Sequence, residues 1–340
     1  MSRRRSGIAC LRDRRGIAIV IVLWVVLVLS LLISGFAFTM HVETQVASFA
    51  RKQLKAEMLA RSGIEVARMQ LILDLKSPIE GGFDSLNQAW ATNEDLYVDH
   101  PLGDGTFNVK VTDEESKIPI NTATDLQLRR LFILLGVDPV DVDVIVDSIL
   151  DWREAGDLTR LNGAKNDYYE SLSPPYHCKN APMDRVEELL LVRGVTPELF
   201  HGLPATEDQE ASPPLSDLFT TASTGRINVN TASATVLRAF LNLDDVQVQA
   251  VLSRRDGSDG IPGTEDDEPF RTPEEFFAVL GNLDPATREQ DQGLVDVSSS
   301  FFTVNSTGEV GGAKRTIIAT LRRDGDNIQP IAWRQARGGT

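Results

Sequence analysis

Cysteine and histidine are scarce in this sequence. Its 340 residues include two cysteines, Cys10 and Cys178, and four histidines. Cys10 lies in a basic N-terminal stretch and Cys178 far beyond a long apolar run, so we expect the thiols on opposite sides of a membrane and no disulfide between them. No Cys and His residues have metal-site spacing, and neither a G-x-S-x-G motif nor a phosphate-binding glycine loop occurs. The sequence therefore does not indicate an enzyme.

Positive charge is scarce outside the N-terminus. The formal net charge is −15, and residues 1–16 hold six Arg against one Asp, a net charge of +5, so the rest of the chain carries −20. An acidic body repels phosphate backbones and attracts divalent cations or basic protein surfaces. This distribution argues against nucleic-acid binding.

Charged residues are absent from residues 17–40. As a helix, this run would span about 36 Å, which is enough to cross a hydrocarbon core of about 30 Å. The run is too long for a cleaved secretory signal, and no small-residue cleavage site follows it. By the positive-inside rule, the Arg-rich leader stays cytoplasmic and the globular part lies in the periplasm. We therefore expect a single-pass anchor in the inner membrane.

Helical periodicity continues beyond this run. Apolar residues keep helical spacing from residue 41 to about residue 76, and Gly63 is the one weak helix former there. A turn-rich stretch, residues 77–86, ends the pattern. The chain thus predicts one long helix whose second half offers an apolar stripe to a globular domain.

The junction between leader and apolar run carries a resemblance. Arg14, Arg15 and Gly16 precede the bulky Ile17, and this layout resembles the prepilin family of type IV pilins and type II secretion pseudopilins. The resemblance implies that a prepilin peptidase cleaves between Gly16 and Ile17 and that Ile17 is N-methylated. Most members have Glu at the fifth mature position, where this chain has Ile21. An intramembrane carboxylate is costly without a partner charge, so its absence suits a subunit with no neighbour above it, as in K-type minor pseudopilins.

Predicted strands come from both ends of the globular part. Residues 106–112, 301–305 and 316–321 read as strands, and the glycine-rich residues 306–315 suit a hairpin connection. A sheet formed from both ends must have the middle of the chain inserted into it. The order and spacing of these segments are similar to those of the K-type family.

The expected fold is therefore α+β. A pilin-like long N-terminal helix packs on a small antiparallel sheet, which is interrupted by a large inserted all-helical domain with helix-hairpin-like repeats. The expected parts are a basic leader at 1–16, the transmembrane helix at 17–40, its periplasmic continuation at 41–76, the first part of the sheet at 77–120, the inserted domain at 121–297 and the second part of the sheet at 298–340.

The middle of the chain contains an internal repeat. Residues 118–131 align with residues 227–240, and each copy has an extended entry, an Asn-Thr pair that can cap a helix, and helix-spaced apolar residues. A second helix is expected after each copy, at 142–152 and at 246–254. A third, weaker pair is expected at 188–203.

These helix pairs allow an alternative. They resemble the helix-hairpin-helix DNA-binding module, so the chain could be a membrane-anchored DNA-uptake receptor. That module needs a glycine-rich turn whose amides face a phosphate, with basic residues alongside. The turns here hold Asp138, Asp244 and Asp245. The sequence therefore favours a protein-interaction domain.

Two acidic loops are candidate calcium sites. The first, residues 151–183, is similar to the family's acidic loop, but Lys165 stands at a family Glu position, which weakens the calcium hypothesis there. Its carboxylates are Asp151, Glu154, Asp157 and Asp167. The second, residues 256–270, has its carboxylates interleaved with glycines, as suits a hard cation, although it does not follow the EF-hand pattern. Its candidate ligands are Asp256, Asp259, Glu265, Asp266 and Asp267.

The resemblance also implies a function. K-type proteins are minor pseudopilins at the tip of a short periplasmic filament that serves protein export across the outer membrane, where they help start assembly and limit length. The implied partners are I- and J-type minor pseudopilins, the major pseudopilin, the prepilin peptidase and the inner-membrane assembly platform. Besides the DNA-uptake receptor, an enzyme or solute-binding protein on a signal anchor is a competing interpretation.

Overall fold

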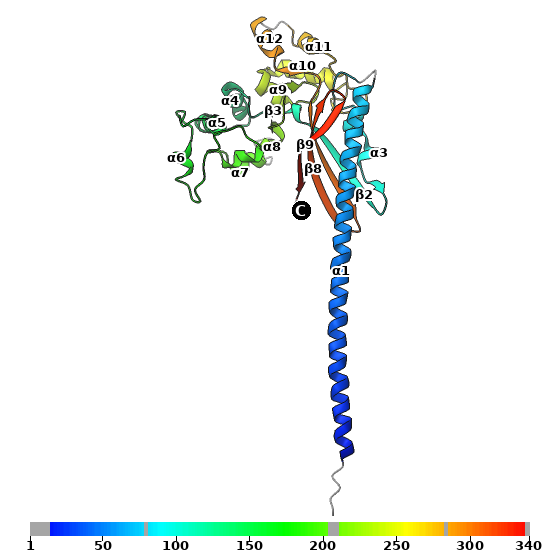
Figure 1. Ribbon diagram of the computed structural model, residues 1–340. Helices are drawn as coiled ribbons and strands as arrows, with labels where there is room; N and C mark the ends of the chain where they lie inside the picture. Colours follow the sequence, from blue (N-terminus) through cyan, green and yellow to red (C-terminus); the bar gives the residue numbers. More distant parts are fainter. Residues whose placement is uncertain (1–13, 78–80, 203–210, 282–284, 337–340) are drawn as a thin grey trace, which may run out of the picture. The chain divides into compact units, whose positions relative to one another are not determined.

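The computed structural model describes residues 14–77, 81–202, 211–281 and 285–336 (Figure 1). The chain divides into two compact units, one ending at Lys55 and the other beginning at Ala56. The predicted leader, apart from its last three residues, lies outside the described residues, as does Cys10.

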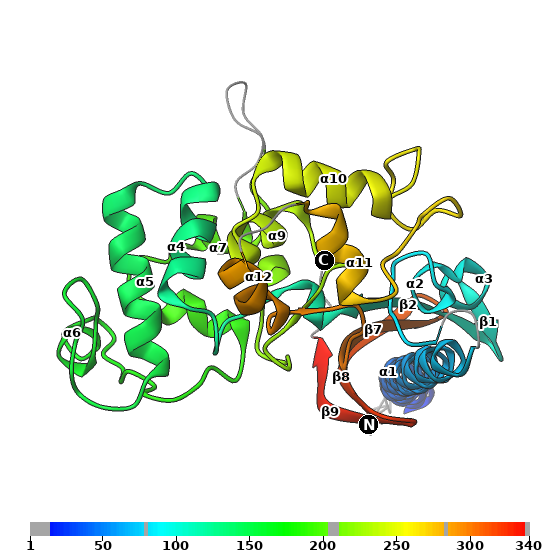
Figure 2. The ribbon, with the colours of Figure 1, turned by 90° about the horizontal axis from the view of Figure 1, so that it is seen from above.

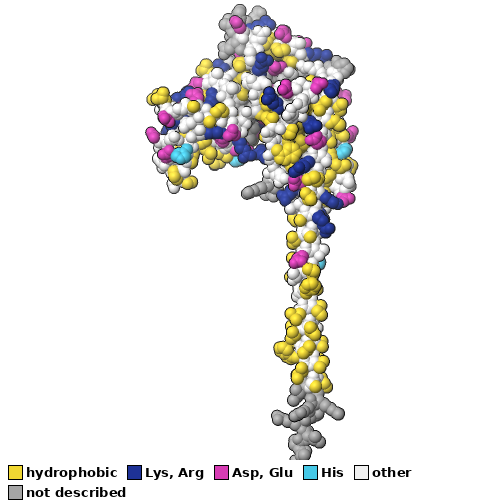
Figure 3. Space-filling view, in the orientation of Figure 1, with side chains coloured by type: hydrophobic (Ala, Val, Ile, Leu, Met, Phe, Trp, Pro, Cys, Tyr) yellow, Lys and Arg dark blue, Asp and Glu magenta, His cyan; other side chains and the backbone are white. Residues whose placement is uncertain are grey.

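The first unit is the N-terminal part of α1 (Arg14–Lys76), a helix of 63 residues. Its large apolar side chains from Ile19 to Met40 are all exposed, and Figure 3 shows this stretch covered by hydrophobic side chains. Among the described residues, α1 alone is long and apolar enough to cross a membrane. The hydroxyl of Thr39 donates to the Gly35 carbonyl at 3.0 Å, which satisfies that polar group within the helix.

In the second unit, α1 packs on a five-stranded antiparallel sheet. The strand order is β1-β2-β7-β8-β9, and Figure 2 shows the sheet curving around the helix. Small residues of α1, among them Ala56, Ala60 and Ala67, are fully buried against it. The strands are β1 (His100–Leu102), β2 (Gly105–Asp113), β7 (Phe301–Val310), β8 (Ala313–Asp324) and β9 (Asn327–Ala336).

The sheet draws its strands from both ends of the chain, which confirms the predicted fold class. β2 pairs with β7, with Asp113 opposite Phe302, so the segment between them is an insertion. β7 and β8 continue through most of the predicted hairpin connection and turn at Gly311 and Gly312. β2 ends at Asp113, seven residues before the boundary expected at 120.

The insertion contains the two predicted helix pairs. α4 (Asp125–Leu134) is followed by α5 (Pro139–Arg153), and α9 (Ala234–Leu241) by α10 (Asp245–Arg255). At the third predicted pair, residues 188–203, the structure has the 3₁₀ helix η2 (Val186–Leu191) and the short α7 (Pro197–His201).

The insertion is not purely helical, which corrects the expectation of an all-helical domain. β3 (Ile118–Pro119) pairs in parallel with β4 (Phe219–Thr220), and β5 (Ile227–Asn228) with β6 (Val295–Asp296). These short bridges satisfy the backbone groups of the extended entries to the two repeats. The remaining elements are α2 (Ala89–Thr92) and α3 (Glu94–Tyr97) before the sheet, and η1 (Glu114–Ser116), α6 (Asn166–Tyr169), α8 (Leu215–Leu218), α11 (Pro273–Val279) and α12 (Pro285–Gln292) in the insertion.

The second unit has two hydrophobic cores, one in its helix-and-sheet part and one in the insertion. One lies between α1 and the sheet, where the ring of Trp90 meets that of Phe302 edge-on at 5.4 Å between centroids. The other fills the insertion, where the aromatic side chains of Phe132 and Phe219 pack at 6.3 Å. Because each part has its own core, the groups at their border determine how the insertion is held on the sheet.

Candidate functional sites

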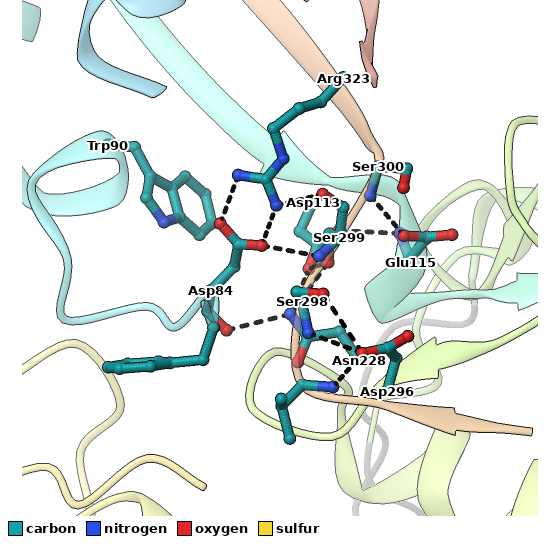
Figure 4. Close-up of polar contacts among 12 residues, drawn as sticks. Asp84, Trp90, Asp113, Glu115, Asn228, Asp296, Ser298, Ser299, Ser300 and Arg323 are labelled. Carbon is teal, nitrogen blue, oxygen red and sulfur yellow. Dashed lines mark hydrogen bonds and ion pairs between the residues drawn. The ribbon is translucent and has the colours of Figure 1, made fainter. Parts of the chain in front are cut away.

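A buried polar network lies where the insertion leaves and rejoins the sheet (Figure 4). Asp113, at the end of β2, accepts hydrogen bonds from the hydroxyls of Ser299 and Thr231, both at 2.6 Å, and from the amide of Asn228 at 3.1 Å. Its other carboxylate oxygen accepts from the Glu115 backbone amide at 2.8 Å. Residues 298–300, which lead from the insertion back to β7, form the return segment. The end of β2, this return segment and the second repeat thus meet at the carboxyl group of Asp113.

The segment after α1 joins the same network. The Asp84 carboxylate pairs with the Arg323 guanidinium of β8, at 2.9 Å for one of the two contacts, and accepts from the Ser299 amide at 2.6 Å. Glu115 accepts from the Ser300 amide at 2.6 Å. Figure 4 shows Asp84 and Glu115 approaching the return segment from different sides. The junction is therefore held by directional, largely charge-assisted bonds.

Burial has an electrostatic consequence at this junction. Asp113 is only 2% exposed, and burial raises its carboxyl pKa to about 7, although hydrogen bonds from Ser299 and Thr231 act in the opposite direction. The Asp84 carboxylate nearby raises it further. The carboxyl group that holds strand, return segment and insertion together therefore keeps its proton to a higher pH than an exposed aspartate does.

The internal repeat recurs in three dimensions. Arg153, at the end of α5, donates to the carbonyls of Ile120 and Ala123, the latter at 2.6 Å. At the end of α10, Arg255 donates to the carbonyls of Val229 and Ala232, at 3.1 and 2.7 Å. Both pairs of carbonyls occupy equivalent positions of the repeat. One guanidinium thus fixes the entry segment of each helix pair.

The asparagines of the repeat do not cap helices, contrary to expectation. Asn121 exchanges two hydrogen bonds with the backbone of Met183, at 2.9 and 2.7 Å, and Asn230 does the same with Phe270, at 2.9 and 2.8 Å. The N-caps are Thr124 and Ser233. Each asparagine instead holds the far end of the acidic loop that follows its helix pair.

In the first acidic loop, the structure brings together two of the four candidate ligands. Arg160 donates to the carboxylate of Asp151 at 2.9 Å and to that of Glu154 at 2.8 Å. Asp157 and Asp167 are exposed and contribute to neither pair. Cys178 is buried in this loop as a free thiol, as expected, and burial raises its pKa. The two converging carboxylates therefore already have an arginine as counter-ion.

In the second acidic loop, three of the five candidate ligands surround one hydroxyl group. Thr264 Oγ1 lies 2.7 Å from an oxygen of Asp266, 3.2 Å from one of Asp267 and 3.5 Å from one of Asp259. A hydroxyl has one proton, so it can donate to one of these acceptors at a time. The other two oxygens lie near this hydroxyl without its proton, although that of Asp259 accepts from the Ile261 amide at 2.8 Å. Carboxylates gathered around one hydroxyl in this way are an arrangement that a cation would stabilise.

The other candidates in this loop lie apart. Asp256 pairs with Arg255 at 2.5 Å, and Glu265 is exposed. Hydrogen bonds from the Ser258 side chain, then from Thr264 and the Ser258 amide, lower the pKa of Asp266. In the part of the chain that the structure describes, no group of three or more acidic, His or Cys side chains is arranged to hold a metal ion as it stands. The second loop would have to rearrange its carboxylates around a cation.

The predicted processing site lies in the first turn of α1. Gly16 and Ile17 are within the helix, and Ile21 is 57% exposed on its surface. An exposed isoleucine is compatible with a lipid-facing or subunit-facing position. Cleavage at Gly16 remains a prediction.

The helix-pair turns do not offer free amides to a phosphate. The side chain of Asp138 accepts from the Val140 amide at 2.9 Å, and that of Asp244 from the Gln247 amide at 2.8 Å. These aspartates occupy the helix N-termini at which the DNA-binding module would hold a phosphate. The geometry thus adds to the charge argument against nucleic acid.

Sequence reasoning did not find the junction network. Its members are polar residues scattered along the chain, and the bond between Asp84 and Arg323 joins residues 239 positions apart. One residue of the network could have been suspected from the repeat. Asn228 belongs to the extended entry of the second copy, and a buried polar side chain at such a position needs hydrogen-bond partners. No pattern identified Asp84, Asp113, Glu115 or Arg323.

Comparison with known proteins identifies related chains. Two family models, both described as "Type II secretion system (T2SS), protein K", match residues 105–205 and 227–297, together just over half of the chain. A type II secretion system protein K from Pseudomonas aeruginosa is 25% identical, with 96% of this chain and 95% of the relative covered. One from Aeromonas hydrophila is also 25% identical, with 96% and 98% covered.

A solved structure has the same fold. A chain of the GspK-GspI-GspJ complex from enterotoxigenic Escherichia coli superposes with a TM-score of 0.66 at 19% identity, covering 87% of this chain and all of that chain. This likeness supports a pilin-like fold with an inserted domain.

Proposed function

Because the chain belongs to the type II secretion system protein K family, we propose that this minor pseudopilin caps the tip of the periplasmic pseudopilus, where it helps start assembly and limits filament length. It acts as a structural component whose binding energy comes from protein surfaces. The coarser assignment, a pseudopilin component of this secretion system, follows from the family. Capping and length control are proposed for this chain on structural grounds.

The observation that carries the proposal is where the insertion sits. It leaves the sheet at Asp113 and returns at Ser299, and both residues lie beside Asp84, which follows the C-terminal end of α1. A stacked pilin-like subunit would have to approach this end of the helix. In the view from above, the insertion lies beside this end of the helix (Figure 2), so its bulk would obstruct a further subunit that stacks there.

Deleting the insertion tests capping. Asp113 already lies opposite Phe302 in the sheet, so a hairpin turn of about four residues can replace the insertion between β2 and β7. We expect the full-length chain to shorten overproduced pseudopili and the deletion variant to leave them long, as measured by electron microscopy. Amide exchange of β7 and β8 checks that the variant's sheet is folded. A folded deletion variant that still shortens filaments contradicts the steric mechanism.

We propose that partners are recruited through the helix and the pilin-like part. By analogy with the complex of its structural relative, these partners are I- and J-type minor pseudopilins, with the major pseudopilin below them and the inner-membrane platform at the base. Co-purification of tagged full-length protein with each minor pseudopilin tests this. If deletion of the insertion alone abolished co-purification of both partners, the binding surface would lie on the insertion instead.

We propose that prepilin peptidase cleaves the chain after Gly16, that Ile17 is N-methylated, and that the N-terminus faces the cytoplasm and the second unit the periplasm. One apolar helix within the described residues supports a single-pass anchor. Mass analysis after co-expression with the peptidase should find a chain that begins at methylated Ile17. A Gly16→Leu variant is the control, since it should keep the leader, and a wild-type chain with its leader intact would refute the proposal.

We propose calcium as the ligand of the second acidic loop. The support is the convergence of Asp259, Asp266 and Asp267 on the single proton of Thr264. A chelator should lower the melting temperature of the full-length protein in detergent, and Asp266→Ala with Asp267→Ala should reduce this response. Asp157→Ala with Asp167→Ala, in the first loop, is the matched control. Equal melting of the wild type with and without chelator would exclude a stabilising calcium ion.

A further inference from the structure

The side chain of Lys165 ends inside the first acidic loop. The residue is only 6% exposed, and its ammonium group donates to three oxygens: the Asp151 carbonyl at 2.5 Å, the Glu154 carbonyl at 2.7 Å and Asn180 Oδ1 at 2.7 Å. An ammonium group has three N–H donors and no acceptor. Every donor of this buried cation is therefore satisfied.

These oxygens lie where a positive charge is electrostatically favourable. Asp151 and Glu154 lie at the C-terminal end of α5, where the last carbonyls of a helix lack partners and the helix dipole is negative. The buried Asp151 carboxylate beside them is paired with Arg160. Loop carbonyls, an amide oxygen and nearby carboxylates are the donor set that hard metal ions select. Here that set surrounds a lysine.

The second acidic loop, which follows the other helix pair, has no such group. Residues 256–270 contain six carboxylates and no Lys, Arg or His. The two loops occupy equivalent places, since each begins at the arginine-bearing end of its helix pair and is held at its far end by Asn121 or Asn230. One loop carries a cation in its own sequence, whereas the other does not.

We propose that Lys165 is a built-in cation: its ammonium group holds the oxygens of the first acidic loop in the place of a metal ion, so this loop folds without metal. The residues of this loop consequently do not fit the calcium site that the family resemblance implies. Asp151 and Glu154 serve as partners of Arg160, while Asp157 and Asp167 remain at the surface. This inference stands whether or not the second loop binds calcium.

The test measures amide exchange in the first loop of the full-length protein in detergent. The amides of Arg160, Asn162 and Gly163 are hydrogen-bonded to Asp151, Asp147 and the Arg160 carbonyl, so their exchange rates report opening of this loop. Wild-type exchange should be the same in millimolar calcium and in chelator. Lys165→Met should exchange about tenfold faster or more in both, because buried oxygens lose their donors.

The variant Lys165→Glu distinguishes two interpretations of this site, a cation site and a simple helix cap. This variant adds a carboxylate to the oxygens that surround the ammonium group, so it should exchange rapidly in chelator and be slowed several-fold by calcium. Lys179→Met is the matched control: Lys179 lies in the same loop and is half-buried, but it pairs with Asp184 and Glu188 instead of the oxygens around Lys165, so residues 160–163 should exchange as in the wild type.

Three outcomes would overturn the proposal. Slower wild-type exchange at residues 160–163 in calcium would show a metal bound beside Lys165. Wild-type exchange rates in Lys165→Met would show that the ammonium group holds nothing. Equal exchange of Lys165→Glu with and without calcium would show that these oxygens do not form a cation site. The second loop enters none of these measurements, so its calcium response is tested independently.

Discussion

Replacing Gly63 by alanine tests how closely α1 packs on the sheet. A glycine in the interior of a helix costs about 1 kcal/mol relative to alanine. On helix propensity alone, Gly63→Ala should therefore stabilise the protein by about that amount. Gly63 was also the one weak helix former in the helical pattern of the sequence, so the substitution tests whether the structure requires a glycine there.

The structure predicts the opposite sign. A Cβ atom at position 63 would overlap the hydroxyl of Ser306 and would lie 2.8 Å from Val109 Cγ2 and 3.1 Å from Phe107 Cδ2. Overpacking of a filled core costs about 1–3 kcal/mol, and because two of these neighbours belong to fully buried side chains, we expect a cost in the upper part of this range, about 2–3 kcal/mol. After the gain in helix propensity, we expect a net loss of about 1–2 kcal/mol. At about 2–4 °C for each kcal/mol, the melting temperature should fall by roughly 2–8 °C.

The assay is thermal unfolding of the full-length protein in detergent. Ser306→Ala removes the overlapping hydroxyl, which is buried and has no hydrogen-bond partner within the described residues, so this change alone should cost little. Combined with Gly63→Ala it should restore much of the loss. Ser62→Ala, one position away at a half-buried site where the hydroxyl bonds to the Met58 carbonyl within the helix, is the control for helix propensity. A higher melting temperature for Gly63→Ala would refute the close packing of helix and sheet.

The junction and the repeat give three further predictions. Burial raises the pKa of Asp113 to about 7 from its ordinary value of 3.8, so at intermediate pH the folded chain holds a proton that the unfolded chain has lost. Stability should therefore fall as the pH rises from about 4 to 7 and then level off, and Asp113→Asn should flatten this slope in melting curves taken across that range. Arg323→Met should cost about 3–5 kcal/mol because it leaves the buried Asp84 unpaired, and adding Asp84→Asn should recover part of the loss in denaturant titrations. Arg153→Lys should lose one of its two carbonyl contacts, and Arg255→Lys should lose part of the contacts that its guanidinium makes to two carbonyls and to Asp256. Each change should raise amide exchange in the helix pair that carries it and leave the other pair unchanged.

The long helix, the two-ended sheet and the paired helices could be predicted because their signals are local. The spacing of apolar residues indicates α1, and the repeated Asn-Thr-Ala pattern indicates both helix pairs without knowledge of any contact. β9 lacked such a signal. Only Ile328 of this edge strand is buried, and Pro330 adjoins the register shift opposite Thr320 and Leu321. A strand with one buried side chain and a proline does not alternate in hydrophobicity.

The contents of the first acidic loop show a second limit of sequence reasoning. The substitution of Lys165 at an acidic family position was visible in the sequence and weakened the calcium hypothesis. Its cause was not visible, because two of the three oxygens around the ammonium group are backbone carbonyls. Every residue has a backbone carbonyl, so composition and spacing do not reveal which carbonyls point toward the ammonium group. Candidate ligands chosen by side-chain type therefore included Asp157 and Asp167, which the fold leaves at the surface.

A polar junction suits an insertion that must keep a fixed orientation. Apolar contacts are non-directional and tolerate sliding, whereas the bonds from Asp113, Asp84 and Glu115 each require a particular donor at a particular angle. Two separate cores joined only by apolar surface could shift relative to each other and move the insertion away from the helix. Because the proposed steric capping requires the insertion to stay beside the end of α1, the buried carboxylates at its base are the groups on which this capping depends most directly.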